Sequence, residues 1–139
     1  MNEQTKTNDV TDRIKTLEDA YADRGYTKEE KRPYLTPVDD FQEALNAVAD
    51  AFVFVEALNE GKDPYENEGD YKCWPVFDMY DGDDAESGFG FTTVGRGWAH
   101  SNSYVGARLS FSEDRIAKYA GKTFTTTYQK FMKKQPTQK

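Results

Sequence analysis

Apolar residues recur at helical spacing near the start of the chain. Four of them follow one another at intervals of four, three and four residues, which is typical of one face of a helix. Gly25 comes four residues after the last of them, where a glycine often ends a helix in the left-handed conformation. We therefore predict an N-terminal helix that ends at Gly25. Its apolar face consists of Val10, Ile14, Leu17 and Tyr21.

A second helix is predicted to begin at Thr36. Pro33 keeps the charged connection of residues 26–35 from continuing as helix, because proline has no amide hydrogen to donate. Thr36 can cap the helix, and Pro37 suits its first position. Asp39 adds an acidic group near the positive end of the helix dipole. The apolar stripe of this helix, which we expect to be buried against a sheet or the last helix, consists of Phe41, Leu45, Val48, Phe52 and Val55.

The last part of this second helix is apolar almost all round before Gly61 stops it. Phe54 lies about 200° around the helix from Phe52, so one face cannot bury both rings. Two explanations are open: the N-terminal helix covers Phe54, or another subunit does. Phe52, Phe54 and Leu58 are therefore candidate residues of a protein interface, formed with a partner protein or by self-association.

After residue 70 the pattern changes from helical spacing to short aromatic and β-branched runs. Three such runs are separated by turn-rich segments, which is typical of an antiparallel meander. Pro75 inside the first run favours an edge position, because it cannot donate a hydrogen bond to a neighbouring strand. The three predicted strands are Tyr71–Tyr80, Gly88–Val94 and Tyr104–Phe111.

A last helix is predicted to follow Ser112, which can cap it. Glu113 and Asp114 in its first turn, and lysines at its end, match the helix dipole. Gly121 and the run Thr125–Thr127 weaken the helical pattern in the middle. The apolar face of this helix consists of Ile116, Ala120, Phe124, Tyr128 and Phe131.

Together these elements predict one α+β domain. It contains two N-terminal helices, a three-stranded antiparallel meander and a C-terminal helix packed on the sheet. A length of 139 residues fits a single domain. We place this domain at residues 9–134, with a helical part at 9–61 and a βββα part at 71–134. Flexible tails are expected at residues 1–8 and 135–139.

Charge is spread unevenly along the chain. The net charge is −7, but residues 1–70 hold 8 basic and 18 acidic residues (−10), whereas residues 71–139 hold 10 and 7 (+3). The second half also carries many aromatic residues, and a basic, aromatic composition is typical of surfaces that bind single-stranded nucleic acid. The alternative is an ordinary solvated helix face. The candidate nucleic-acid contacts are Arg96, Arg108, Arg115, Lys118 and Lys122.

The sequence contains no clear catalytic or metal-binding pattern. Cys73 and His100 are the only cysteine and histidine, so they cannot form a four-ligand zinc site, and neither lies in a nucleophile motif. The acidic turn Asp78–Glu86 lacks the EF-hand spacing and is typical of a solvated hairpin turn. Gly88–Val94 is similar to part of the RNA recognition motif signature, but the order of elements around it is different. We therefore expect no enzyme activity, no cofactor and no metal.

Composition and the apolar runs indicate where the protein resides. The N-terminus is polar and the longest apolar run is Ala51–Val55, so neither a signal peptide nor a membrane span is expected. The single cysteine excludes an internal disulfide. Aromatic residues make up 14% of the chain, which argues against disorder throughout. A folded protein in the cytoplasm is the expectation.

Several segments of the second half together resemble a recurrent C-terminal module. They are Trp74–Met79, Gly88–Phe91, Val105–Phe111 and Ala117–Phe124, followed by Tyr128 and Phe131. The module resembles a loose group of small uncharacterised proteins in gut Bacteroidetes genomes and their prophages. Ser110 departs from that group, in which a cysteine is expected. The resemblance implies a phage-type accessory protein and, with the broadly apolar second helix, leads us to expect a protein-interaction or assembly module.

Overall fold

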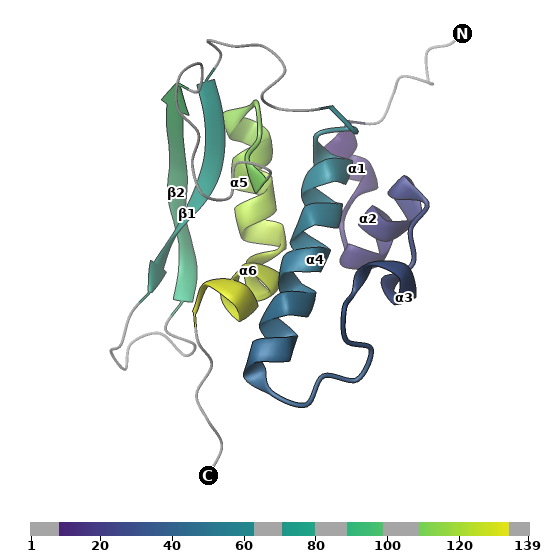
Figure 1. Ribbon diagram of the computed structural model, residues 1–139. Coiled ribbons are helices and arrows are strands. Elements are labelled where there is room, and N and C mark those ends of the chain that lie inside the picture. The colour runs from purple at the N-terminus through teal and green to yellow at the C-terminus, as the bar shows by residue number, and fades with distance from the viewer. Residues whose placement is uncertain (1–8, 63–70, 80–88, 99–108, 134–139) are drawn as a thin grey trace, which may run out of the picture.

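A computed structural model describes residues 9–62, 71–79, 89–98 and 109–133. The described segments form successive layers (Figure 1): a small sheet, then the helices α5 and α6, then the long helix α4, then the short helices α1 to α3. Helix α5 packs on both strands, while α6 and α2 each pack on α4. Mixed helix and sheet agree with the predicted α+β class. The elements are α1 (Val10–Arg13), α2 (Leu17–Arg24), α3 (Lys28–Lys31), α4 (Asp40–Leu58), β1 (Tyr71–Met79), β2 (Phe89–Trp98), α5 (Asp114–Thr123) and α6 (Thr125–Met132).

The N-terminal helix is interrupted where the sequence predicts one continuous helix. Ile14 has extended backbone angles, and Thr16 then caps α2 through a hydrogen bond that its hydroxyl accepts from the amide of Asp19. The predicted end at Gly25 is confirmed, since this residue is left-handed with φ 73°. The connection that follows also contains the short helix α3, which the sequence analysis missed. Thr27 caps it through a pair of bonds: the Thr27 hydroxyl accepts from the amide of Glu30, and the Glu30 carboxylate accepts from the amide of Thr27.

Helix α4 begins at Asp40 and not at Thr36. Asp39 has the extended conformation of a capping residue, and its carboxylate accepts a hydrogen bond of 2.9 Å from the amide of Gln42. The Gln42 side chain in turn accepts a bond from the amide of Val38. The carboxylate of Asp39 therefore takes the capping role that we assigned to Thr36.

The described sheet has two antiparallel strands. Their register runs from Tyr71 opposite Trp98 to Met79 opposite Phe89, with an irregularity after Val76. Residues 104–108 of the predicted third strand lie outside the described residues. Phe111, at the end of that run, forms an isolated bridge to Cys73 through two backbone hydrogen bonds of 2.7 Å. The three-stranded meander is therefore not confirmed.

Pro75 occupies a position in β1 that tolerates the loss of an amide hydrogen. Cys73 directs both of its backbone groups toward Phe111, away from β2. Alternate residues of a strand direct these groups to the same side, so the backbone groups of Pro75 also point away from β2. The pairing of the two strands is therefore undisturbed at this position, where Pro75 lies opposite Val94.

The C-terminal helix is divided at Phe124, which leaves helical geometry with φ −111° and ψ 31°. The Thr125 hydroxyl donates a hydrogen bond of 2.7 Å to the carbonyl of Gly121 at this break. Ser112 is not the capping residue: Glu113 precedes α5 and makes no side-chain capping bond. The predicted apolar face is nevertheless confirmed. Of its members, Ile116, Ala120, Phe124 and Tyr128 are buried, and Phe131 is partly buried.

The centre of the core is the Phe54 ring, which is fully buried. It stacks on the ring of Phe124 with a centroid distance of 4.1 Å and contacts the edge of Tyr128 at 5.4 Å. The rings of Phe124 and Tyr128 therefore cover Phe54, and the chain buries this ring without another subunit. The N-terminal helices contribute Ile14 and Tyr21 to the same buried cluster.

The predicted buried stripe of α4 is only partly correct. Val55 is buried and Val48 is half-buried, whereas Leu45 is exposed and Phe41 and Phe52 are 68% and 38% exposed.

The hydroxyl of Tyr128 is buried without a hydrogen-bond partner among the described residues. Burial raises the pKa of this phenol, and burial together with a bond to Asp50 also raises the pKa of Tyr21. Above pH 10 the unfolded chain therefore loses two protons that the folded chain keeps. The contribution of these two phenols to the free energy of unfolding is complete below pH 10. It decreases as the pH rises above 10, by about 1.4 kcal/mol per pH unit for each tyrosine.

Tyr128→Phe is expected to separate these two effects. At pH 7 it should raise the free energy of unfolding by about 1 kcal/mol, because an unsatisfied buried hydroxyl is removed while the ring stays. Above pH 10 the free energy of unfolding of the variant should fall less steeply with pH than that of the wild type, because unfolding of the variant releases one proton fewer. Urea unfolding curves between pH 7 and 11 measure both quantities. A loss of stability at pH 7 would mean that the hydroxyl has a partner.

Candidate functional site

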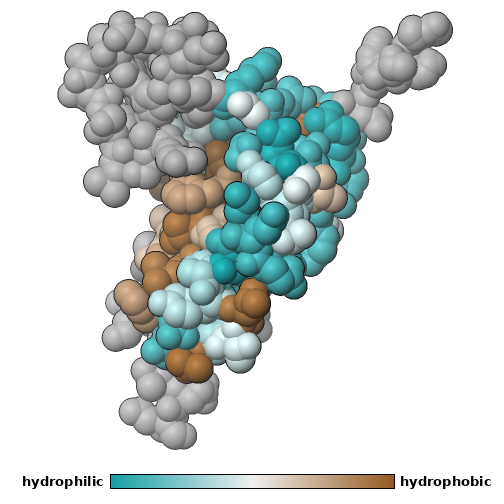
Figure 2. Space-filling view, turned by 45° about the vertical axis from the view of Figure 1, so that its right-hand side comes forward, coloured by the Kyte–Doolittle hydropathy of each residue, from teal (hydrophilic) through white to brown (hydrophobic). Residues whose placement is uncertain are grey.

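The most conspicuous feature of the described surface is an apolar face on and around the first half of α4. Its residues are 37% to 77% exposed, although all are large and apolar. Figure 2 shows hydrophobic residues in a band along one side of the molecule and again at its lower end, beside a broad hydrophilic area. We call this surface the α4 face. It consists of Leu35, Val38, Phe41, Leu45 and Phe52, with Met132 at the end of α6.

Two buried polar residues on the opposite side of α4 hold this arrangement in place. The Asn46 side chain accepts a hydrogen bond from the amide of Tyr34 and donates one of 2.7 Å to its carbonyl. One turn later, Asp50 binds the guanidinium of Arg32 through two bonds of 2.9 and 2.7 Å. The connection before α4 is thus fixed to its inner side, which leaves the stripe of Phe41 and Phe52 outside.

The Asp50 cluster is a structural group rather than a reactive one. Its carboxylate also accepts a hydrogen bond of 2.7 Å from the hydroxyl of Tyr21. The hydrogen bonds that Arg32 donates to Asp50 raise the pKa of its guanidinium, so this group stays charged. A guanidinium that stays charged and a phenol that stays protonated do not act as proton donors or acceptors near neutral pH.

Acidic residues border the α4 face at the N-terminal end of the helix. Asp39 and Asp40 come directly before Phe41 in the chain, and no described basic residue pairs with them. Glu43 lies about 200° around the helix from Phe41, on the side of Asn46. Farther along, the carboxylate of Glu56 is 3.3 Å from Arg24. Helix α4 itself contains no lysine or arginine. The unneutralised negative charge of the helix is therefore concentrated where its apolar side chains are most exposed.

Of the three interface residues predicted from the sequence, only Phe52 lies at the surface. Phe54 and Leu58 are buried, with 0% and 2% of their surface exposed. The sequence predicts Phe41 and Leu45 to be core residues, and Leu35 and Val38 are not among its candidates. The polar pair Asn46 and Asp50 lies on the Phe54 side of α4 and, by its chemistry alone, favours exposure of that side. Both are buried because Tyr34 and Arg32 bind them, and no local signal in the sequence reveals these partners.

Three of the five predicted nucleic-acid contacts are described, and all lie on α5. The Arg115 guanidinium pairs with Asp9 at 2.8 Å and with Glu113 at 3.5 Å. Its hydrogen bond holds the pKa of the Asp9 carboxyl well below its usual range. The ammonium of Lys122 is 5.9 Å from the centre of the Phe91 ring. Lys118 is exposed. The side chains of Arg96 and Arg108 are outside the described residues.

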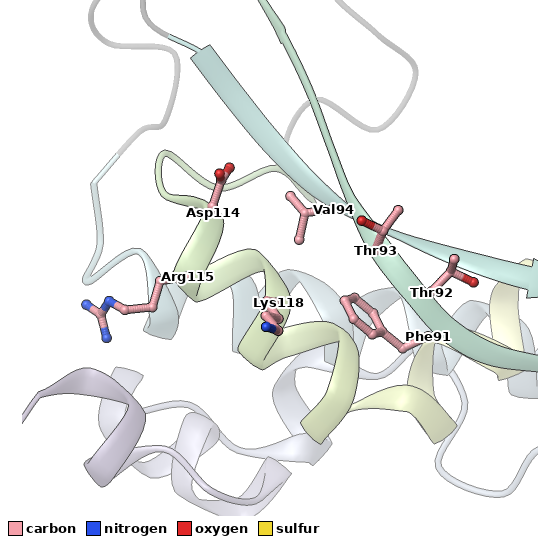
Figure 3. Close-up of a pocket in the computed structure, with 7 residues that line it drawn as sticks. All are labelled: Phe91, Thr92, Thr93, Val94, Asp114, Arg115 and Lys118. Atoms are coloured by element: carbon pink, nitrogen blue, oxygen red, sulfur yellow. The ribbon is translucent and has the colours of Figure 1, made fainter.

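An open cleft of about 590 Å³ lies between β2 and the start of α5 (Figure 3). One wall carries the side chains of Phe91 and Val94, and the other carries Asp114 and Lys118. The carboxylate of Asp114 accepts a hydrogen bond of 3.1 Å from the buried thiol of Cys73. Cys73 itself is buried and is not among the residues that line the cleft. The described lining of the cleft is Phe91, Thr92, Thr93, Val94, Asp114, Arg115 and Lys118.

The remaining sequence candidates do not form a described site. His100 and residues 80–88 of the acidic turn lie outside the described residues, as does the side chain of Asp78. Among the residues that the structure covers, no three metal-ligating side chains come together. No helix in the same part of the chain is long and apolar enough to cross a membrane.

Comparison with known proteins does not change this interpretation. No protein-family model matches the chain, and searches among curated proteins and solved structures found no match.

Proposed function

We propose that the protein is a non-enzymatic interaction module that docks a segment of a partner protein on the α4 face. The observation that carries this proposal is the exposure of six large apolar side chains in the segment before α4, on α4 and at the end of α6. Six side chains of this size that are each 37% to 77% exposed present together on the order of 600 Å² of apolar area, since a whole large side chain has roughly 150–250 Å². This is the upper end of what ordinary monomers expose, and such patches often mark binding sites.

The area also fits the size of the proposed occupant. A standard interface between two globular proteins buries about 800 Å² on each side. The α4 face is somewhat smaller and runs along one helix, which suits a single docked segment better than a whole domain. The resemblance of the second half to Bacteroidetes and prophage proteins is the ground for proposing a phage-type accessory role.

Nucleic-acid binding through α5 is the weaker alternative. Arg115 already shares its charge with two carboxylates, and the protein carries a net charge of −7. Binding requires basic side chains that are free to neutralise phosphates and so release the counterions condensed on the nucleic acid. Of the three described candidates, only Lys118 and Lys122 lack a carboxylate partner among the described residues, which is a small basic surface for this purpose.

Phe41→Asp is expected to abolish docking without unfolding the protein. Because Phe41 is 68% exposed, an aspartate there should change the free energy of unfolding by no more than about 0.5 kcal/mol. Peptides that bind the immobilised wild-type protein can be selected from a phage-displayed library of random peptides. The enriched peptides should bind the Phe41→Asp variant at least about tenfold more weakly, because a charge replaces an apolar anchor at the centre of the face.

The matched control for this selection is Thr92→Asp, which places the same charge on an exposed position of β2. The enriched peptides should bind this variant as they bind the wild type. Peptides that bind all three proteins equally would contradict the proposal, since the α4 face would then not be the docking surface. A circular dichroism spectrum of each variant verifies that it is folded.

A further inference from the structure

We infer that the outer edge of β2 binds an extended, acidic segment of a partner protein as an added strand. This edge is separate from the α4 face, so the inference does not depend on the proposed function. It is supported by backbone groups of β2 that point away from β1, by the position of the cleft beside them, and by two lysines of α5 that no described carboxylate neutralises.

Val94 directs its backbone groups away from β1. It lies opposite Pro75, whose own groups point away from β2, and both residues of such an antiparallel pair face outward. Among the described residues, none donates to the Val94 carbonyl or accepts from the Val94 amide. An edge of this kind is a template for another strand, because the added chain supplies the missing donors and acceptors.

The sequence of β2 lacks the residues that commonly protect an edge strand. It contains no proline, lysine or acidic residue, and its single charged residue is Arg96. The irregularity of the sheet lies on the Phe91 side of Thr93, and the register from Thr93 to Trp98 is regular. An added strand of about five residues, a common length in globular proteins, can therefore pair along this stretch.

The cleft reaches the same edge. Four consecutive residues of β2, residues 91–94, line it, and no residue of β1 is in its described lining. Because alternate side chains of a strand point to opposite faces, a cleft with this lining meets the strand at its edge. Phe91 and Val94 project toward α5 (Figure 3). A residue of the added strand opposite Val94 points to the same face, so its side chain enters the cleft.

The charge beside the edge favours acidic residues in the added strand. Lys118 lines the cleft, and the ammonium of Lys122, one turn later on α5, is 5.9 Å from the centre of the Phe91 ring. The other two charged residues of the described lining already have partners: Asp114 binds a thiol, and Arg115 pairs with two carboxylates. An acidic side chain two positions from the one in the cleft lies on the same face and complements the lysines.

The same features exclude a helix and a second copy of this chain as the occupant. A helix satisfies its own backbone groups and has none to offer the edge. A second β2 would bring no carboxylate to the lysines, because this strand contains no acidic residue. The occupant is therefore a segment of different sequence.

Peptide selection tests the predicted sequence of the segment. Short random peptides displayed on phage are selected on the full-length Phe41→Asp variant, so that the α4 face does not contribute. The enriched peptides should contain an apolar and an acidic residue two positions apart. A selection that enriches no such peptide would overturn the inference, whereas docking on the α4 face would be unaffected because it is tested on the wild type.

Methylation of single peptide amides tests the pairing itself. In synthetic versions of an enriched peptide, every second amide faces β2 and the others face solvent. An N-methyl group on an amide that faces β2 should weaken binding about tenfold, because it removes a hydrogen bond and obstructs the approach of the strands. Methyl groups on the other amides should have little effect. Equal effects at all positions would mean that the peptide does not bind as a strand.

Val94→Pro removes the outward amide hydrogen without removing a hydrogen bond to β1, as Pro75 does on the other strand. It should abolish peptide binding and leave the circular dichroism spectrum unchanged. If this variant unfolds, hydrogen exchange of the wild type decides. The amide of Val94 should exchange faster than that of Gly95, and the peptide should slow it at least about tenfold. A Val94 amide that the peptide does not protect would contradict the inference.

Two charge reversals test the role of the lysines. Lys118→Glu should weaken binding of the enriched peptide about tenfold. Lys15→Glu makes the same change in net charge at an exposed position before α2 and should have a much smaller effect. Equal effects would show that total charge, and not the row on α5, attracts the peptide. A dimer in light scattering that Val94→Pro dissociates would identify a second copy as the occupant and would also overturn the inference.

Discussion

Phe54→Ala is expected to lower the free energy of unfolding by about 3–5 kcal/mol. The substitution removes a fully buried ring that stacks on Phe124 and contacts Tyr128, and it leaves a cavity between α4 and α6. Those two helices cannot close the space without moving the sheet, because α5 continues into α6 and packs on both strands. A loss of this size is a large part of the total stability of a small domain. Urea unfolding monitored by circular dichroism measures it.

Phe52→Ala is the matched control for this variant. It removes the same ring from the same helix two residues earlier, but Phe52 is 38% exposed. The cost should therefore be clearly smaller, at about 1–2 kcal/mol, since part of the ring is already in water. If the two alanine variants lost equal stability, or if Phe52→Ala lost more, the core would lie on the other side of α4.

Asp50→Ala should cost about 2–4 kcal/mol. The substitution leaves the Arg32 guanidinium and the Tyr21 hydroxyl without their shared acceptor. Breaking a fully buried ion pair typically costs 3–5 kcal/mol, because the remaining charge stays buried. The lower range applies here since the Arg32 side chain is 29% exposed, whereas that of Asp50 is only 6% exposed. Thermal and urea unfolding of the purified variant give the value.

The control for Asp50→Ala is Glu56→Ala on the same helix. Glu56 also receives bonds from an arginine and a tyrosine, Arg24 and Tyr26, but its side chain is 39% exposed. Surface pairs of this kind contribute at most about 1 kcal/mol. A larger loss for Glu56→Ala than for Asp50→Ala would show that the connection before α4 is held by something other than the Asp50 cluster.

The sequence alone predicts those parts of the fold that local chemistry determines. The left-handed glycine at Gly25 ends α2 because few other residues adopt that conformation without strain. The apolar face of the last helix is also correctly predicted. Its residues are flanked by charged ones on the other side, so only one face can be buried. The break at Phe124 was indicated by Gly121 and Thr125, although neither fixes the residue at which the helix divides.

The orientation of α4 is the main error, and its cause is physical. This helix has apolar residues on both sides, so periodicity cannot tell which side enters the core. The choice depends on partners distant in sequence: Phe124 stacks on Phe54, and Arg32 neutralises Asp50. Because these contacts are tertiary, local spacing contains no information about them. The same error put Phe54 and Leu58 in the predicted interface.

The contact between Phe54 and Phe124 joins the two halves of the chain in one core, and this has a consequence for how the gene can change. A recombination event that joined residues 9–62 to a foreign second half would separate the two rings. Each recombinant would then expose either Phe54 or Phe124, unless the new half placed another ring in the position of the missing one. The two halves are therefore expected to be inherited together, and a substitution at either ring should favour a compensating change at the other.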